Sequence, residues 1–398
     1  MLHGFYFRFY RMLHCEWLAA VLARLAYGIF WGKYAISRLK CRKKNINVSK
    51  ANALEIISNI HQDPKGRPNY ERMEVDESID LSIIVPVYNY VDLIEANIES
   101  ILKQKTHYSY QLILIDDGST DGAQDILHKY ENCPNIKVIF RQNQGIAAAR
   151  NTGLKNAVGK YIMFVDCDDL VEDNLVETLM SRAYKDDCDI VMCAHNLVKE
   201  KNGKVYEILP NVYPRYNLLN YAPKATILNY AGLPWAKVYK RELWENVRYL
   251  PGYWYEDTII HSLIFTQCNK FAYEPVACYQ YRWYENNFSH TQNKSENPKS
   301  IDTYWMLQHI LERYGELQFP KDERYETMLL KHLSAYYYNK VHGLEEHVVE
   351  ALFVLACSLY QEYGLQEGCK LPYMLRVTRK ALKQGDINLW KIATKYQK

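Results

Sequence analysis

The chain has 398 residues and a mass of 47.0 kDa, which is enough for two or three folded units. Hydrophobic residues make up 48% and charged residues 24%, a composition that excludes a disordered, collagen-like or multi-span membrane protein. The net charge of +3 is too small to imply a nucleic-acid partner. Ten cysteines without a CxxC pair indicate reduced thiols in a reducing compartment and argue against a zinc site.

The positive charge is concentrated at the N-terminus. Residues 1–50 hold ten Lys or Arg and one Glu, whereas the remaining residues hold 39 basic and 45 acidic side chains. An apolar run extends over residues 17–36, but Arg24 and Lys33 divide it into pieces too short to span a bilayer. A transmembrane helix is therefore not expected here.

Residues 1–44 have the composition of a helix that lies in a membrane interface. Aromatic residues such as Trp17, Phe30 and Trp31 would enter the lipid, and the Lys and Arg side chains would meet anionic headgroups. An amphipathic helix docked on its own protein is the alternative. Residues 45–80 are polar and without a sustained apolar period, so they are interpreted as a linker.

Short apolar runs alternate with helix-like segments after the linker. The expected strands are 81–87, 111–115, 136–140, 161–165 and 190–193, and the expected helices are 92–103, 123–130, 146–158 and 174–184. This alternation predicts an α/β fold with an open, mainly parallel sheet covered by helices on both faces. Such sheets bind ligands at the carboxyl ends of their strands.

Polar clusters follow four of these strands and are expected to meet at one edge of the sheet. Two familiar phosphate-binding motifs are missing from these positions: no GxGxxG follows the first strand, and Gly153 to Lys160 lacks the P-loop spacing. The most informative cluster is Asp166-Cys167-Asp168-Asp169. Residues i and i+2 of an extended chain point the same way, so Asp166 and Asp168 can share one divalent cation. The simpler interpretation is that these acids cap the following helix.

Four segments in this order resemble glycosyltransferase family 2, whose members have the GT-A fold and use nucleotide sugars. The matching segments are Leu81-Ser82-Ile83-Ile84-Val85-Pro86-Val87-Tyr88-Asn89, Ile115-Asp116-Asp117-Gly118-Ser119-Thr120-Asp121, Asn143-Gln144-Gly145-Ile146-Ala147-Ala148-Ala149-Arg150-Asn151 and Phe164-Val165-Asp166-Cys167-Asp168-Asp169. The resemblance covers roughly residues 81–195 and extends more loosely to about residue 290. Later segments, including Tyr255-Glu256-Asp257-Thr258, resemble the bacterial capsule, exopolysaccharide and O-antigen branch of the family.

The resemblance implies a nucleotide pocket and a metal site. The nucleotide would be bound by Pro86, Tyr88, Asn89, Asp117, Asn143, Arg150 and Asp166. Asp168 and Asp166 would hold Mn²⁺ or Mg²⁺. The donor sugar or diphosphate would meet Asp169, Arg282 and Ser289. Arg150 is equally compatible with an ordinary ion pair inside the domain.

The resemblance also implies a catalytic base. Asp257 occupies its position and would deprotonate the acceptor hydroxyl as that oxygen attacks the anomeric carbon. Glu256 competes for this role, because consecutive helical residues point about 100° apart and only one can face the donor. A single displacement of this kind inverts the anomeric configuration.

The expected organisation has five parts. Residues 1–44 form the basic amphipathic segment, 45–80 the linker, 81–195 the nucleotide-sugar half of the GT-A domain, 196–299 its acceptor half, and 300–398 a helical C-terminal domain. The C-terminal helices are expected near 304–314, 325–342 and 346–363, where apolar residues recur at helical spacing. Oligomerisation remains open.

The predicted function is an inverting, metal-dependent glycosyltransferase at the cytoplasmic face of a bacterial membrane. It would move sugar from a UDP-sugar to a glycan or a lipid-linked glycan. One alternative is a nucleotidyltransferase, although residues 87–102 lack the Gly and Lys/Arg of a triphosphate loop. The other is a catalytically silent scaffold of the same fold. A glycosidase, which also uses paired carboxylates, is disfavoured by the nucleotide-pocket pattern.

Overall fold

The computed structural model describes residues 16–201, 204–211, 224–230, 232–284, 294–365 and 369–397. The chain forms two compact units. The sheet unit contains Pro64–Asn293 and Glu312–Phe319, and the helical unit contains Met1–Asp63, Lys294–Leu311 and Pro320–Lys398. No disulfide joins the nine cysteines in the described part of the chain.

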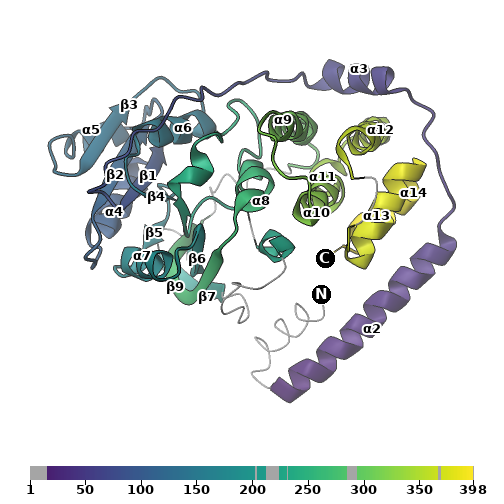
Figure 1. The fold of residues 1–398 in the computed structure, drawn as a ribbon, viewed down its shortest axis with the longest axis horizontal. Coiled ribbons are helices and arrows are strands. Elements are labelled where there is room, and N and C mark those ends of the chain that lie inside the picture. Colours follow the sequence, from purple (N-terminus) through teal and green to yellow (C-terminus); the bar gives the residue numbers. More distant parts are fainter. Residues whose placement is uncertain are drawn as a thin grey trace. The chain divides into compact units, whose positions relative to one another are not determined.

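The sheet unit is built on a mixed sheet (Figure 1). Its strands are β1 (Leu81–Val87), β2 (Tyr110–Asp116), β3 (Ile136–Phe140), β4 (Tyr161–Phe164), β5 (Leu170–Val171), β6 (Ile190–Lys201), β7 (Lys204–Asn211), β8 (Lys237–Lys240) and β9 (Phe271–Trp283). The spatial order is β3-β2-β1-β4-β8-β6-β9-β5, and β7 pairs with β6. The first four strands in this order are parallel, whereas β8 is antiparallel to both of its neighbours.

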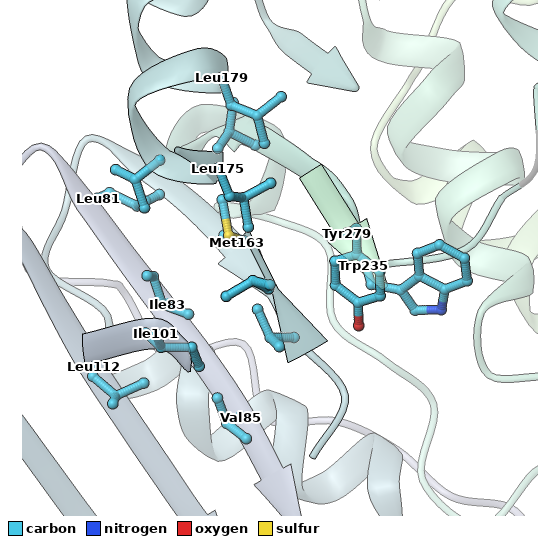
Figure 2. Packing of buried hydrophobic residues seen from close by; sticks show 14 of the residues in the cluster. Leu81, Ile83, Val85, Ile101, Leu112, Met163, Leu175, Leu179, Trp235 and Tyr279 are labelled. Atoms are coloured by element: carbon cyan, nitrogen blue, oxygen red, sulfur yellow. The ribbon is translucent and has the colours of Figure 1, made fainter. Parts of the chain in front are cut away.

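Helices cover both faces of the parallel part. They are α4 (Val91–Leu102), α5 (Ala123–His128), α6 (Ile146–Asn156) and α7 (Leu175–Asp186). Figure 2 shows Ile83 and Val85 of β1 in one cluster with Ile101 of α4 and Leu175 of α7. On the other face α6 approaches closely, because a Cβ on Gly153 would lie 2.3 Å from the Ile84 side chain. Burial on both faces explains the unbroken apolar runs in the sequence.

The expected α/β elements are present, most of them with ends displaced by no more than two residues. The main differences occur where tertiary contacts extend or break a pattern. β6 continues to Lys201 because its polar second half pairs with β7 and β9. The helix expected over 325–342 is two helices, α10 (Glu323–His332) and α11 (Ala335–Val341).

The helical unit contains the remaining long helices, except for residues 312–316 of α9, which belong to the sheet unit. They are α2 (Glu16–Lys40), α3 (Lys50–Ile60), α9 (Asp302–Glu316), α10, α11, α12 (Glu346–Tyr363), α13 (Tyr373–Gln384) and α14 (Ile387–Lys395). The helix α3 lies within the polar segment interpreted as a linker. Only Ala53 and Ile57 of this helix are fully buried, and two buried positions do not produce a sustained apolar period in the sequence. None of the helices described is long and apolar enough to cross a membrane.

Candidate active site

The polar loops after β1, β2 and β3 are joined by hydrogen bonds. The backbone N–H of Asn89 donates to Ser119 Oγ at 3.0 Å, and Thr120 N donates to Asn89 Oδ1 at 2.7 Å. Asn89 has a φ of +58°, a left-handed conformation that Asn tolerates better than most residues. The three strands end at one edge, so their loops form a single polar rim.

The two adjacent acids after β2 have different tasks. Asp116 is fully buried and accepts hydrogen bonds from Gly118 N and Gln124 Nε2, so it shapes its own loop. Asp117 accepts from Gly145 N at 2.8 Å and pairs with Arg141 Nε at 3.2 Å. Burial raises the pKa of Asp117 above its usual value. Asp117 therefore joins the β2 and β3 loops at the position expected to recognise the base.

The other predicted nucleotide residues line the same rim to different extents. Tyr88 is 45% exposed and available to a ligand, whereas Pro86 is buried within β1. The side-chain oxygen Oδ1 of Asn143 accepts a hydrogen bond from Gly145 N at 3.2 Å, which stabilises the turn before α6. Their nucleotide contacts stay predictions, and the exposed Tyr88 ring is available to a base or ribose.

Asn97 of α4 holds the acidic turn after β4. Its side-chain amide donates to the carbonyls of Asp166 at 3.0 Å and Asp169 at 2.7 Å. Asn97 is fully buried in an otherwise apolar helix face. A buried amide that bonds both ends of one turn fixes the directions of the carboxylates between them.

Within this turn, Asp169 points into the protein. It is 1% exposed and accepts from Tyr279 OH at 2.7 Å and Arg282 N at 2.9 Å. Burial, followed by the charges of Asp168 and Asp166, raises the pKa of Asp169 well above its usual value. Contact of Asp169 with donor sugar or diphosphate stays a prediction, and its bonds indicate that it anchors the turn to β9.

Arg150 connects the acidic turn with the Glu256-Asp257 segment. Its guanidinium is buried and contacts Asp166 Oδ1 at 2.9 Å and Glu256 Oε1 at 2.7 Å. The guanidinium carbon also lies 5.3 Å from the centre of the Tyr249 ring. Burial alone would lower the pKa of Arg150, but Asp166, Tyr249 and Glu256 raise it above its usual value. The ion-pair alternative for Arg150 is thus observed, and its assignment to the nucleotide pocket stays a prediction.

The Arg150 contact separates the two adjacent acids Glu256 and Asp257. Glu256 forms an ion pair with Arg150. The backbone carbonyl of Asp257 instead accepts a hydrogen bond from Ile260 N at 2.9 Å, at the start of the helix Ile260–Ile264. Both acids follow Tyr255, whose φ of +65° is strained for an aromatic residue. Burial raises the pKa of the Tyr249 hydroxyl above its usual value, Arg150 opposes this rise, and the charges of Glu256, Asp166 and Asp257 add to it.

Asp166 and Asp168 offer a suitable pair of ligands for a hard cation. Burial and the charge of Asp166 raise the pKa of Asp168 to about 6, and Tyr284 OH donates to Asp168 Oδ2 at 2.9 Å. Two crowded carboxylates of this kind fit Mg²⁺ or Mn²⁺, which take oxygen ligands and fill their shells with phosphate or water. Within the described ranges no three His, Cys, Asp or Glu side chains cluster as a metal site made by protein alone.

The crowding at Asp168 predicts an effect on stability without metal. The pKa of Asp168 is about 6 in the folded chain, above its usual 3.8, so ionisation opposes folding as the pH rises through this window. We expect Asp168→Asn, in EDTA at pH 7, to raise the free energy of unfolding by about 2 kcal/mol. Urea unfolding should show this gain shrinking as the pH falls through 6 and then through 3.8, the usual pKa, below which both states hold the proton.

The matched control is Asp173→Asn, because Asp173 is an exposed acid whose ion pair with Lys105 lies at the surface. It should change the unfolding free energy by less than about 0.5 kcal/mol. Equal or lower stability of Asp168→Asn at pH 7 would contradict the proposed crowding.

The late residues predicted at the diphosphate are only partly described. Arg282 donates through Nε and Nη2 to the two carboxylate oxygens of Glu200, at 2.6 and 2.8 Å. Its guanidinium therefore pairs with Glu200, and its contact with a diphosphate stays a prediction. Ser289 lies outside the described residues.

Several residues that organise the site were not identified from the sequence. They are Asn97, Glu200, Tyr249, Tyr279 and Tyr284. With 35 tyrosines in the chain, no single ring stood out. Asn97 alone carried a signal, since it is a polar residue on the apolar stripe of α4 between Ile94 and Ile101.

Comparison with known proteins places this arrangement in a family. Residues 82–246 match the model for "Glycosyl transferase family 2". The chain is 30% identical over 230 residues to the uncharacterized glycosyltransferase YibD of Escherichia coli, covering 56% of this chain and 66% of YibD. It is also 30% identical over 212 residues to the glycosyltransferase GlyG of Streptococcus pneumoniae, covering 51% of this chain and 70% of GlyG.

This chain belongs to glycosyltransferase family 2. A crystal structure of residues 1–349 of Staphylococcus aureus TarS with UDP-GlcNAc matches its fold with a TM-score of 0.61 and 18% identity, covering 80% of this chain and 91% of that one. The expected GT-A fold is confirmed by this match. The chain spans about two thirds of YibD and GlyG, and 31% of another curated relative.

The family assignment confirms the expected membership in glycosyltransferase family 2 and argues against the nucleotidyltransferase alternative. The four quoted motifs lie within residues 82–246, apart from Leu81, and Glu256-Asp257 lies beyond them. Arg150 joins the matched region to that later segment through its contacts with Asp166 and Glu256.

Proposed function

We propose that this glycosyltransferase moves a sugar from a UDP-sugar to a hydroxyl group of a glycan or lipid-linked glycan during synthesis of a bacterial surface polysaccharide. The observation that carries the proposal is the buried Arg150, which holds the acidic turn at Asp166 beside the Glu256-Asp257 segment. A site for a charged diphosphate and a carboxylate base are thereby kept close together. TarS, which shares the fold, was crystallised with UDP-GlcNAc, and this supports UDP as the nucleotide.

In the proposed reaction, Tyr88 and Asp117 position the nucleotide at the ends of β1 and β2. Asp257 accepts the proton of the acceptor hydroxyl as its oxygen bonds to the anomeric carbon and the bond to the diphosphate breaks. Glu256 remains paired with Arg150 and keeps the segment in place. One displacement of this type inverts the anomeric centre. A divalent cation held by Asp166 and Asp168 would neutralise the diphosphate charge.

We also propose that the protein acts peripherally at the inner face of the membrane. The basic, apolar segment 1–44 supports this location, and a lipid-linked acceptor would be found there. Residues 1–15 of this segment lie outside the described residues.

Binding of UDP with and without Mn²⁺, measured as a thermal shift, tests the donor proposal. We expect UDP with Mn²⁺ to raise the melting temperature of the wild type, in line with about 2.7 kcal/mol of stabilisation at a ligand concentration of 100 Kd. Asp168→Asn should lose most of this ligand-induced shift, because one of the two cation ligands is gone.

Asp173→Asn, an exposed acid outside the site, should retain the full shift. CDP and GDP serve as nucleotide controls. If no uridine nucleotide stabilises the folded wild type under any metal condition, the UDP-sugar proposal is wrong.

A further inference from the structure

The inner face of α2 is packed against the C-terminal helices of the same unit. Phe30 and Tyr34 contact Tyr396, which follows α14, with ring centres 5.1 and 5.4 Å apart. Trp31 contacts Tyr373 of α13 at 5.6 Å. These contacts fix the rotation of α2 about its axis, and they turn Phe30 and Trp31 away from the lipid-facing position expected from the sequence.

The outer face of α2 carries an apolar row that this fixed rotation leaves exposed. Leu18, Leu25, Ile29 and Ile36 recur at intervals of seven, four and seven residues. At about 100° per residue they fall within about 40° of one another, so they form one straight row. Leu25, Ile29 and Ile36 are 58%, 60% and 55% exposed. We call these four residues the outer stripe.

Exposed cations lie along one edge of the outer stripe. Lys33 and Lys40 are within about 60° of the row's centre, whereas the exposed Arg24 lies about 120° from it on the other side. Residues 17–44 contain seven Lys or Arg and no Asp or Glu. An exposed apolar row on a helix that is otherwise cationic matches the boundary between lipid chains and anionic headgroups.

We propose that α2 lies in the plane of an anionic membrane, with the outer stripe in the lipid and Arg24, Lys33 and Lys40 among the headgroups. This inference refines the peripheral location proposed above and rests on it. It changes the side of the helix expected to enter the lipid: the aliphatic residues of the outer stripe insert, whereas Phe30 and Trp31 pack against Tyr396 and Tyr373.

Charge complementarity favours lipid over a second copy of this chain as the partner of the outer stripe. Two copies of α2 packed through their stripes would bring Lys33 and Lys40 together without an acidic residue from 17–44 to compensate them. Like charges at a close interface oppose association. Anionic headgroups supply the missing negative charge, and their attraction weakens with added salt.

Vesicle flotation of the full chain tests this assignment. The vesicles contain phosphatidylcholine alone or phosphatidylcholine with phosphatidylglycerol. We expect the wild type to bind the anionic vesicles, and the Leu25→Ser/Ile29→Ser/Ile36→Ser variant to bind them at least tenfold more weakly. Arg24→Gln/Lys33→Gln/Lys40→Gln should lose the preference for anionic vesicles and the sensitivity to salt.

The matched control removes apolar side chains of similar exposure from the sheet unit. Val205 and Ile208 of β7 are 53% and 56% exposed, so Val205→Ser/Ile208→Ser should bind vesicles like the wild type. The inference is overturned if the stripe variant binds as the wild type does. It is also overturned if sedimentation velocity shows that the stripe holds a dimer together while vesicle binding is absent.

A second readout separates this inference from the proposed function. The stripe and charge variants should keep the full UDP-induced thermal shift, because none of their residues belongs to the candidate active site. If the wild type binds UDP but does not bind vesicles, only the membrane assignment is wrong. Vesicle binding without any uridine nucleotide binding would instead remove the donor proposal.

Discussion

Replacing Asp257 with Asn is expected to lower the rate of sugar transfer by about 10³-fold while the affinity for UDP changes little. Removal of a general base typically costs about 10²- to 10⁴-fold in rate. The affinity should be preserved because Asp257 is proposed to act on the acceptor hydroxyl and not on the nucleotide. Transfer from a radiolabelled UDP-sugar to a membrane acceptor, compared with the UDP-induced thermal shift, measures both quantities.

Glu256→Gln is the control for the choice between adjacent acids. Glu256 is 2.7 Å from Arg150 and is proposed to hold the segment in position. Its amide can still accept a hydrogen bond from Arg150, so we expect a loss of about tenfold or less in rate. A larger loss for Glu256→Gln than for Asp257→Asn would exchange the two roles.

Replacing Arg150 with Met should lower the free energy of unfolding by about 3–5 kcal/mol. Breaking a buried ion pair on one side leaves the remaining charge without compensation, and here two carboxylates, Asp166 and Glu256, lose the same partner. The cation–π contact with Tyr249 is lost as well. Urea unfolding monitored by circular dichroism measures the change.

The controls for Arg150 restore charge or remove a partner. Arg150→Lys keeps the cation but cannot bridge two carboxylates in the same way, so we expect a smaller loss of about 1–2 kcal/mol. The double variant Arg150→Met/Glu256→Gln should recover part of the loss, because one uncompensated charge is gone. Unchanged stability of Arg150→Met would show that Asp166 and Glu256 do not depend on this guanidinium.

The sequence located the acidic turn but not the direction of each carboxylate. Asp166, Asp168 and Asp169 were expected at the end of a parallel strand, and that position follows from the apolar run before them. The three acids differ because their side chains contact residues outside this turn. Arg150 pairs with Asp166, Tyr284 donates to Asp168, and Tyr279 donates to Asp169. No local pattern encodes contacts over such separations.

Arg282 shows the same distinction between position and partner. The family resemblance suggested that Arg282 meets the diphosphate from a late loop, and Arg282 lies instead in the strand β9. Its guanidinium pairs with Glu200 because β6 extends far beyond the apolar stretch by which it was recognised. The polar second half of β6 has no clear hydrophobic alternation in the sequence. The pairing of Arg282 with Glu200 therefore became evident only from the pairing of β6 with β9.

The amino-acid sequence by itself determined the α/β fold of residues 81–195, the family and the chemical class of the site, because buried parallel strands and their polar ends leave strong local patterns. Only the tertiary structure decided which acid binds Arg150, which faces inward, and which side of α2 remains exposed. Each of these depends on contacts between residues distant in the sequence. The Arg150 guanidinium lies between Asp166 and Glu256, and Tyr279 of β9 binds Asp169. The aromatic contacts of Phe30 and Trp31 turn one face of α2 inward and leave the opposite face exposed.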